Sequence, residues 1–447
     1  MTSMRNIIKR IGIVLACIVS IYIAMGEGVR ATAVNDSKEY VLLGANDLGM
    51  HCIQQDYSSF MILPPANNIR VQVFEKGQTK NRLVTDGIKV SYEMIDNTTS
   101  VGKSNFWQYA KDYGYNVSTN IGITGNGLAG EMKLSEDQRY FEATAVPVTP
   151  YNDGSKVRNP YQLVKVTVTD TKTGKELAMT DKIVVPVSDE MDCGICHGEN
   201  NTDLNILKAH DKLSGTSLVA DLMKGERHKC ADCHEDNAIG EKGKEDILPL
   251  SEAIHAFHAD KVEVSPIQDP VCYSCHPGVE TQCYRGVMKK EGIACGDEDC
   301  HGGVAQVAKS QSEGRQAWLQ EPNCQECHGE KYANNEGKLY RNSYLNNSPA
   351  QEMNGKVQCI SCHNGPHAEW ESTLEIDNKL PESIQGEAGP IEKCSVCHNN
   401  KKQGKVHHSL TKEQRKVMQE NKKAREGKAE SKINIFKSLF KKYRETS

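Results

Sequence analysis

Cysteine and histidine are concentrated in one part of this chain, and their spacing restricts what that part can fold into. Of the 17 cysteines and 15 histidines, 15 cysteines and 14 histidines lie after Asp192 and before Thr411. Within this segment the pattern Cys-x-x-Cys-His occurs six times, far more often than chance would give at these residue frequencies. A seventh copy, from Cys295 to His301, has four residues between its cysteines. The segment must therefore present two thiols and one imidazole together at seven positions.

The pattern Cys-x-x-Cys-His is the attachment signature of c-type haem. The two thiols add to the two vinyl groups on one edge of the porphyrin, and the histidine then lies on one face, where it can bind the iron. Disulfides and zinc sites also use paired cysteines, but neither requires a histidine after every second cysteine. The sequence therefore predicts seven covalently bound haem c groups. In the longer motif, the alternative is that Cys295 is free and haem is attached through Cys300 alone.

The predicted attachment residues form seven sets. The cysteines are Cys193 and Cys196, Cys230 and Cys233, Cys272 and Cys275, Cys295 and Cys300, Cys324 and Cys327, Cys359 and Cys362, and Cys394 and Cys397. The proximal iron ligands are His197, His234, His276, His301, His328, His363 and His398.

Eight further histidines are candidates for the second axial position of the seven irons: His51, His210, His228, His255, His258, His367, His407 and His408. Iron with two histidine ligands has no open position for a substrate, so it exchanges electrons and does little else. Methionine in place of one histidine would raise the reduction potential. Because enough histidines are present to saturate every iron, we expect mostly low-potential haems. His51 is the weakest candidate, since it lies outside the cysteine-rich segment.

The spacing of the motifs predicts electron conduction. A compact chain as long as the segment from Cys193 to His398 has a radius of gyration of about 17 Å. Seven porphyrins in that volume must have neighbouring edges within about a nanometre of each other. The haems would also supply the apolar interior that a chain with only 6% aromatic residues lacks.

The first 33 residues have the features of a secretory signal peptide. Basic residues precede an apolar stretch from Ile11 to Met25, and Ala31-Thr32-Ala33 follows as a cleavage site. The alternative is an uncleaved anchor, but the apolar stretch is shorter than the ~20 residues that span a bilayer. We expect export, with the protein in the periplasm or at the outer cell surface.

Residues 34–190 are predicted to form an all-β domain. Apolar and polar side chains alternate over residues 69–73, 88–94 and 164–168, which is typical of half-buried strands. Residues 170–174 have the composition of a hairpin turn. A β-sandwich, immunoglobulin-like at the coarsest level, fits about 150 such residues. A short helix is expected over residues 104–110.

Two cysteines, Cys52 and Cys283, remain after export and haem attachment. They either form a disulfide that joins the β domain to the following domain or are free buried thiols.

Residues 411–447 form a basic tail after the predicted haem domain of residues 191–410. From Lys432 to Arg444, apolar residues recur at three- and four-residue spacings with lysines between them. This pattern predicts an amphipathic helix that docks on an anionic membrane surface or an acidic partner, or that packs on its own protein. The whole chain has a net charge of −5, which argues against nucleic-acid binding.

The chain resembles the multihaem cytochromes c of metal- and sulfur-respiring bacteria, in particular members with an N-terminal β domain. The resemblance lies in the segments Asn46–Cys52, Val185–Cys193 and Cys272–Gly278. The longer motif also resembles a variant in small tetrahaem cytochromes of sulfate-respiring bacteria. The resemblance covers most of residues 39–400 and leaves out the tail. Together with the patterns above, the sequence predicts a multidomain protein: a sandwich-like β domain, a haem-packed domain of short helices and loops, and a helical tail.

The function predicted from these features is electron transfer in anaerobic respiration, between a quinol-linked donor and a terminal acceptor. The partners would be other redox proteins, among them other multihaem cytochromes, and the chain itself is not expected to be an enzyme. One alternative is an oxidoreductase with one open haem that acts on a nitrogen or sulfur oxyanion. Another is a subunit of an extracellular cytochrome filament.

Overall fold

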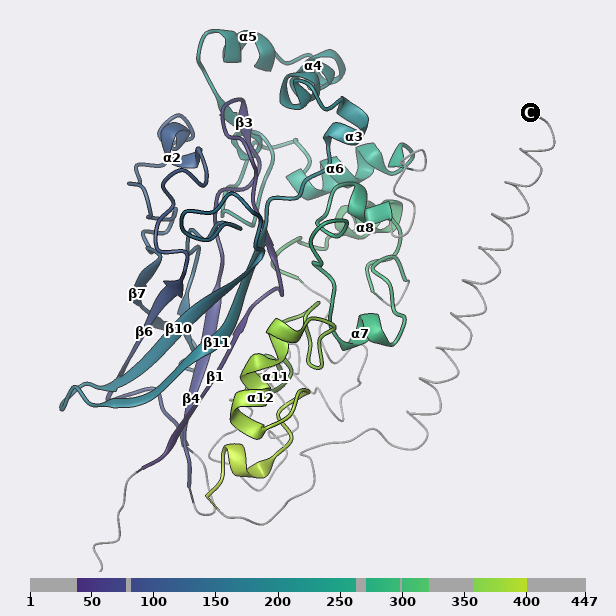
Figure 1. The fold of residues 1–447 in the computed structure, drawn as a ribbon. Coiled ribbons are helices and arrows are strands. Elements are labelled where there is room, and N and C mark those ends of the chain that lie inside the picture. Colours follow the sequence, from purple (N-terminus) through teal and green to yellow (C-terminus); the bar gives the residue numbers. More distant parts are fainter. Residues whose placement is uncertain (1–37, 78–81, 263–270, 298–299, 321–356, 400–447) are drawn as a thin grey trace, which may run out of the picture. The chain divides into compact units, whose positions relative to one another are not determined.

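The computed structural model describes residues 38–77, 82–262, 271–297, 300–320 and 357–399. The described residues from Tyr40 onward belong to one compact unit. Strands predominate up to Ser188 and short helices after it (Figure 1). A β-sheet-rich region followed by a region of short helices agrees with the expectation from the sequence.

The first sheet contains five strands. Its central strand, β4, pairs antiparallel with β1, β9 and the short β5, and β8 pairs with β9 at the edge of the sheet. The strands are β1 (Tyr40–Asn46), β4 (Ile69–Glu75), β5 (Arg82–Leu83), β8 (Lys133–Leu134) and β9 (Phe141–Ala143).

The second sheet also contains five strands, in the order β2-β11-β10-β6-β7. Its strands are β2 (His51–Cys52), β6 (Ile88–Ile95), β7 (Ala129–Glu131), β10 (Tyr161–Asp170) and β11 (Glu176–Ser188). β10 and β11 form a long hairpin, visible in Figure 1. β2 pairs parallel with the end of β11, so His51 lies opposite Val187.

The buried faces of the two sheets contribute to one hydrophobic core. Ile69 and Val71 of β4 belong to the same cluster as Val166 of β10 and Val185 of β11. Each of these side chains is at most 1% exposed. Val164, Val166 and Val168 are buried and alternate with half-buried neighbours along β10, as their period-two spacing predicts.

A second cluster lies around the short helix α2 (Phe106–Tyr109), where the sequence predicts a helix. Phe106 packs edge-to-face on Tyr57, with ring centres 5.2 Å apart. Nearby, β3 (Phe60–Met61) pairs parallel with β12 (His228–Lys229). This small sheet attaches the region of short helices to the β-rich region.

The region of short helices contains no helix longer than α4 among the described residues. Its α-helices are α3 (Gly194–His197), α4 (Thr202–Ser214), α5 (Leu218–Met223), α6 (Leu250–His258), α7 (Val287–Lys290), α8 (Val304–Ser312), α11 (Cys359–His363) and α12 (Lys379–Gln385). Its 3-10 turns are η1 (Cys230–Asp232), η3 (Val271–Ser274), η5 (Glu375–Asn378) and η6 (Cys394–Val396).

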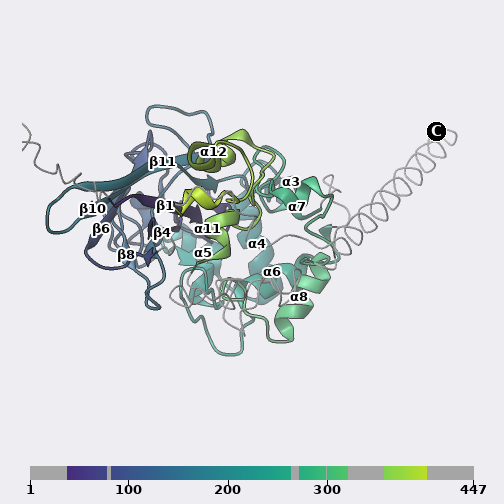
Figure 2. The same ribbon diagram turned by 90° about the horizontal axis from the view of Figure 1, so that it is seen from below.

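The segment from Val357 to Asn399 packs directly on the sheets. Helix α11 contacts β1 and helix α12 contacts β11 (Figure 2). Trp370 and Leu380, at most 3% exposed, belong to the core cluster that the two sheets form. The change of secondary structure after Ser188 therefore does not separate the chain into two independent cores.

The strand predictions for residues 69–73, 88–94 and 164–168 are confirmed by β4, β6 and β10, and the hairpin turn at 170–174 connects β10 to β11. Among the described residues, no helix has both the length and the apolar content needed to cross a bilayer. The predicted signal segment and basic tail lie outside the described residues.

Candidate functional site

The motifs form tight turns that bring their functional groups together. In five of the described motifs, the amide of the motif histidine donates to the carbonyl of the first cysteine, for example His197 to Cys193 at 2.9 Å and His276 to Cys272 at 2.8 Å. This bond closes one helical turn, and residues three and four apart then share a face. The two thiols and the imidazole of one motif therefore lie on one side of the turn.

The longer motif closes in the same way despite its two extra residues. The amide of His301 donates to the carbonyl of Cys295 at 3.2 Å, as four other motif histidines do to their first cysteines. The bond keeps Cys295 beside the histidine.

Five of the six motifs with described residues line one cavity of about 2420 Å³. A site for one drug-sized ligand usually measures about 300–1,000 Å³. Large apolar side chains face this space: Leu213, Leu248, Phe257 and Trp318 line the cavity and are 40–61% exposed. The cavity is therefore large enough for several ligands, and much of its wall is apolar.

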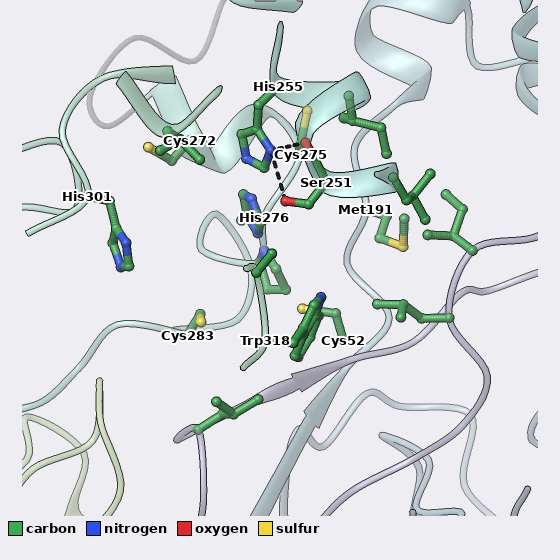
Figure 3. Close-up of a pocket in the computed structure, with 18 of the residues that line it drawn as sticks. Cys52, Met191, Ser251, His255, Cys272, Cys275, His276, Cys283, His301 and Trp318 are labelled. Carbon is green, nitrogen blue, oxygen red and sulfur yellow. Dashed lines mark hydrogen bonds between the residues drawn. The ribbon is translucent and has the colours of Figure 1, made fainter. Parts of the chain in front are cut away.

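Four motif histidines each face one of the other histidines across this cavity. The pairs and the distances between their ring centres are His197 with His258 at 6.4 Å, His234 with His210 at 6.3 Å, His276 with His255 at 6.1 Å, and His301 with His367 at 6.1 Å. Figure 3 shows His255 beside His276, with Cys275 of the same motif nearby. In every pair one ring belongs to a motif and the other is a distal candidate predicted from the sequence.

The spacing of the pairs suits a metal ion between two imidazoles. An imidazole nitrogen lies about 1.2 Å from its ring centre and binds zinc, for example, at about 2.0–2.1 Å. Two rings that share one metal along a line then have centres about 6.4 Å apart. Aromatic rings that pack edge-to-face also have centres about 4.5–7 Å apart. The four observed distances, 6.1–6.4 Å, thus leave room for one metal in each pair.

Hydrogen bonds determine which nitrogen of each distal ring can bind a metal. Nδ1 of His255 donates to the Ser251 carbonyl at 2.7 Å, and Nδ1 of His258 donates to the Ile254 carbonyl at 2.8 Å. A carbonyl only accepts, so the proton is on Nδ1 and the lone pair is on Nε2. Metal-binding histidines usually have such an acceptor at the other nitrogen.

The other two distal rings have the same arrangement. Nδ1 of His367 donates to the Leu48 carbonyl at 3.1 Å. Nδ1 of His210 lies 2.9 Å from the Thr216 hydroxyl, which donates its own proton to Asp211 and therefore accepts from the ring. All four distal rings thus have Nε2 available as a ligand.

Burial favours the neutral form of most of the paired imidazoles. Burial lowers the pKa of six rings, His197, His210, His255, His276, His301 and His367. For His276 and His301, burial and then the facing histidine lower the pKa to about 4. A metal ligand must be deprotonated, so this environment favours metal binding at neutral pH.

Neighbouring motifs are linked through shared elements. His255 and His258 lie three residues apart on α6 and face His276 and His197, so α6 joins two motifs. Thiol contact between Cys272 and Cys295 lowers the pKa of Cys272 and raises that of Cys295.

The remaining links follow the chain from one motif to the next. Asn205 on α4, the helix of His210, donates to the carbonyl of His197 at 2.8 Å. The Ile391 amide donates to the Cys362 carbonyl at 2.8 Å, and burial and then Cys397 raise the pKa of Cys362 to about 12. His367, which faces His301, lies four residues after His363 of the Cys359 motif. The described motifs are therefore neighbours in the order of their first cysteines Cys230, Cys193, Cys272, Cys295, Cys359 and Cys394.

Two candidate histidines do not face a motif histidine among the described residues. Nε2 of the buried His51 lies 2.8 Å from Asp47, so the nitrogen that the paired rings leave available is already bonded. Burial disfavours the charge on Asp47, but His51 and Arg70 outweigh it and lower the pKa of Asp47. His228 lines the cavity, and its Nε2 lies 3.6 Å from Asp221. Nε2 of His51 is therefore occupied in this geometry, and the ring could bind a metal only through Nδ1.

The structure describes only some of the other predicted site residues. Cys359, Cys362 and His363 form α11, and Cys394 and Cys397 lie in or next to η6, with His398 paired to Gly77 in an isolated bridge. Cys324, Cys327, His328, His407 and His408 lie outside the described residues.

Cys52 and Cys283 are free thiols in the structure. Burial, and then the proximity of Cys283, raise the pKa of Cys52, and burial raises the pKa of Cys283 to about 11. In the described ranges, no group of three or more histidine, cysteine, aspartate or glutamate side chains could hold a metal ion by itself. A structural zinc site would need four such ligands.

The backbone acceptors of the distal rings were not predicted from the sequence. Those of His255 and His258 lie four residues earlier on the same helix, so a helix prediction for α6 would have identified them. The Leu48 carbonyl lies 319 residues from His367, and nothing in the sequence indicates that contact.

Comparison with protein-family models, with curated proteins and with solved structures gave no match.

Proposed function

We propose that this chain is an electron-transfer protein that carries seven covalently attached c-type haems, most of them with two histidine ligands. The four facing histidine pairs carry the proposal, because their spacing and Nδ1 hydrogen bonds suit an iron bound by Nε2 of both rings. His258, His210, His255 and His367 would be the distal ligands opposite His197, His234, His276 and His301, in that order. When bound, haem iron takes up and releases one electron.

The residues of the chain would bind and orient the cofactors. Thiols on the short turns would hold one porphyrin edge, and the motif histidine of the same turn would lie on one porphyrin face. Leu213, Leu248, Phe257 and Trp318 would pack against the porphyrins and exclude water from them. Haem packing would then account for a domain of short helices with a large cavity.

Two axial histidines leave no position for a substrate, which favours electron transfer over catalysis. The sites would form a series, because each described motif shares an element or a contact with the next. Electrons would enter from one redox protein and leave to another, in keeping with an exported respiratory protein of the periplasm or cell surface. An oxidoreductase would need at least one iron with an open position.

The test is haem quantitation on protein produced with a c-type maturation system. We expect seven haems per chain. The colour should stay with the polypeptide after acid–acetone extraction, and the low-temperature electron paramagnetic resonance (EPR) spectrum should be predominantly low-spin.

A matched pair of variants tests the assignment of the cysteines. Cys193→Ser with Cys196→Ser should lower the count from seven to six, whereas Cys52→Ser with Cys283→Ser should leave it at seven. Extractable colour, or equal effects of the two double variants, would contradict covalent attachment at the motifs. A dominant high-spin signal would favour an oxidoreductase.

A further inference from the structure

The segment Asn46–Cys52 runs from the last residue of β1 through β2 and lies against the loop that carries His367. A β-carbon added to Gly49 would lie 1.9 Å from the Pro366 carbonyl oxygen, and Gly49 has a φ of +80°. A β-carbon added to Gly365 would lie 2.3 Å from the Asn46 carbonyl oxygen. The two backbones therefore approach so closely that neither glycine leaves space for a side chain.

This contact holds His367 in an uncommon conformation. His367 has a φ of +67°, a region that residues other than glycine seldom adopt. Its ring lies 6.1 Å from His301, and its Nδ1 donates to the Leu48 carbonyl within the Asn46–Cys52 segment. The β-rich region thus contributes the acceptor that orients a distal ring.

Arg285 connects both sides of the contact. Its side chain is fully buried and donates from Nη1 to the Gly49 carbonyl at 2.8 Å. The amides of Arg285 and Gly286 both donate to the His367 carbonyl at 2.7 Å. Arg285 therefore bonds to Gly49, the residue after Leu48, and to His367 itself.

Asp377 orients Arg285. Its carboxylate accepts from Nε and Nη2 of Arg285 at 2.6 and 3.0 Å, and it also accepts from the Ser372 hydroxyl at 2.7 Å. Both charged side chains are 0% exposed. Such a two-point contact sets the direction of the guanidinium group, which lysine could not reproduce.

We propose that Arg285, Asp377 and the Asn46–Cys52 segment are positioning residues that hold His367 as the axial ligand opposite His301. This inference rests on the proposed function. It gives the β-rich region a role in electron transfer, because the Asn46–Cys52 segment would determine the second ligand of the iron bound by His301.

The test removes the ion pair without leaving a buried charge unpaired. The double variant Arg285→Leu with Asp377→Leu removes both charges together, which a buried site tolerates better than loss of one. We expect seven haems per chain, with one iron in seven changed from low-spin to high-spin or shifted in a redox titration. Lys103→Leu with Asp153→Leu is the control, because it removes a pair with a 2.7 Å contact and no contact with a motif.

Two further variants complete the test. His367→Ala should change the spin state or the reduction potential of the same iron. Adding the double leucine variant to His367→Ala should cause no further change. Arg285→Lys keeps the positive charge, so it should fold even where the double leucine variant does not. It should shift the reduction potential of the same iron to a smaller extent.

Seven haems with a spectrum and redox titration unchanged in both Arg285 variants would overturn the positioning role. If His367→Ala also left the spectrum unchanged, or if the unaltered protein carried no haem, the proposed function itself would be wrong.

Discussion

Helix α6 offers the sharpest test of the histidine pairs, because one short helix supplies distal rings to two motifs. We predict that His255→Leu and His258→Leu each remove one axial ligand, from the irons bound by His276 and His197 respectively. Each single variant should convert one iron in seven from low-spin to high-spin, and the double variant two in seven. The effects should add, because the two rings serve different irons.

The fold should tolerate these changes. The two lost hydrogen bonds run from Nδ1 to carbonyls of the same helix, and each such bond contributes about 0.5–1.5 kcal/mol. The Ser251 and Ile254 carbonyls are four residues before the two histidines, so they can still accept the backbone amides. Apart from ligation, the double variant should therefore lose at most about 3 kcal/mol of stability.

The assay is spin quantitation by EPR together with a haem count on the same sample. His51→Leu is the matched control, because its Nε2 is bonded to Asp47 and it should leave the low-spin intensity unchanged. The pairing would be refuted if either α6 variant kept full low-spin intensity at seven haems per chain. If His51→Leu lowered the low-spin intensity as much as either α6 variant, the inference that hydrogen bonding at Nε2 keeps His51 from binding iron would be refuted.

Three other predictions concern pH, backbone strain and the core. Unfolded histidine titrates at about pH 6.5, whereas the folded pKa of His276 and His301 is about 4. The stability that these neutral rings contribute is therefore present above pH 6.5 and is lost as the pH falls toward 4; the unfolding free energy should fall over this range, and an unchanged unfolding free energy would contradict the burial argument. Gly49→Ala should lower the unfolding free energy by more than about 1 kcal/mol in urea titration, because of its positive φ and the close Pro366 carbonyl, and an unchanged midpoint would exclude that strain. Ile69→Val, in a side chain 0% exposed, should cost about 0.5–1.5 kcal/mol in the same titration without altering the haem spectrum; a spectral change would show coupling between the core and the sites.

The local part of the site could be predicted from the sequence. The spacing Cys-x-x-Cys-His dictates one turn with its groups on one side, and the His197 amide does bond the Cys193 carbonyl. Alternation along 164–168 likewise predicts β10, because period two is a property of the extended backbone. Both inferences depend only on residues close together in the chain.

The partners of these elements could not be predicted in the same way. The sequence places His51 apart from the other candidate histidines, but it assigns no candidate to a particular motif, and only folding determines that His258 faces His197 while His51 bonds Asp47. The packing of α11 and α12 on the sheets also depends on contacts between distant residues, and no local pattern encodes it.

The hydrogen bond from His367 to Leu48 joins residues 319 positions apart, and it has a consequence for assembly in the cell. Covalent attachment needs only a short exposed motif, so a maturation enzyme can load the Cys295 motif on an unfolded chain. The sixth ligand of that iron is oriented only after the first strand and the last helices of the described chain have met. Under the proposed function, completion of this centre would therefore report that the chain from β1 to the loop of His367 has folded, and molecules that end before His367 would carry haem with incomplete coordination.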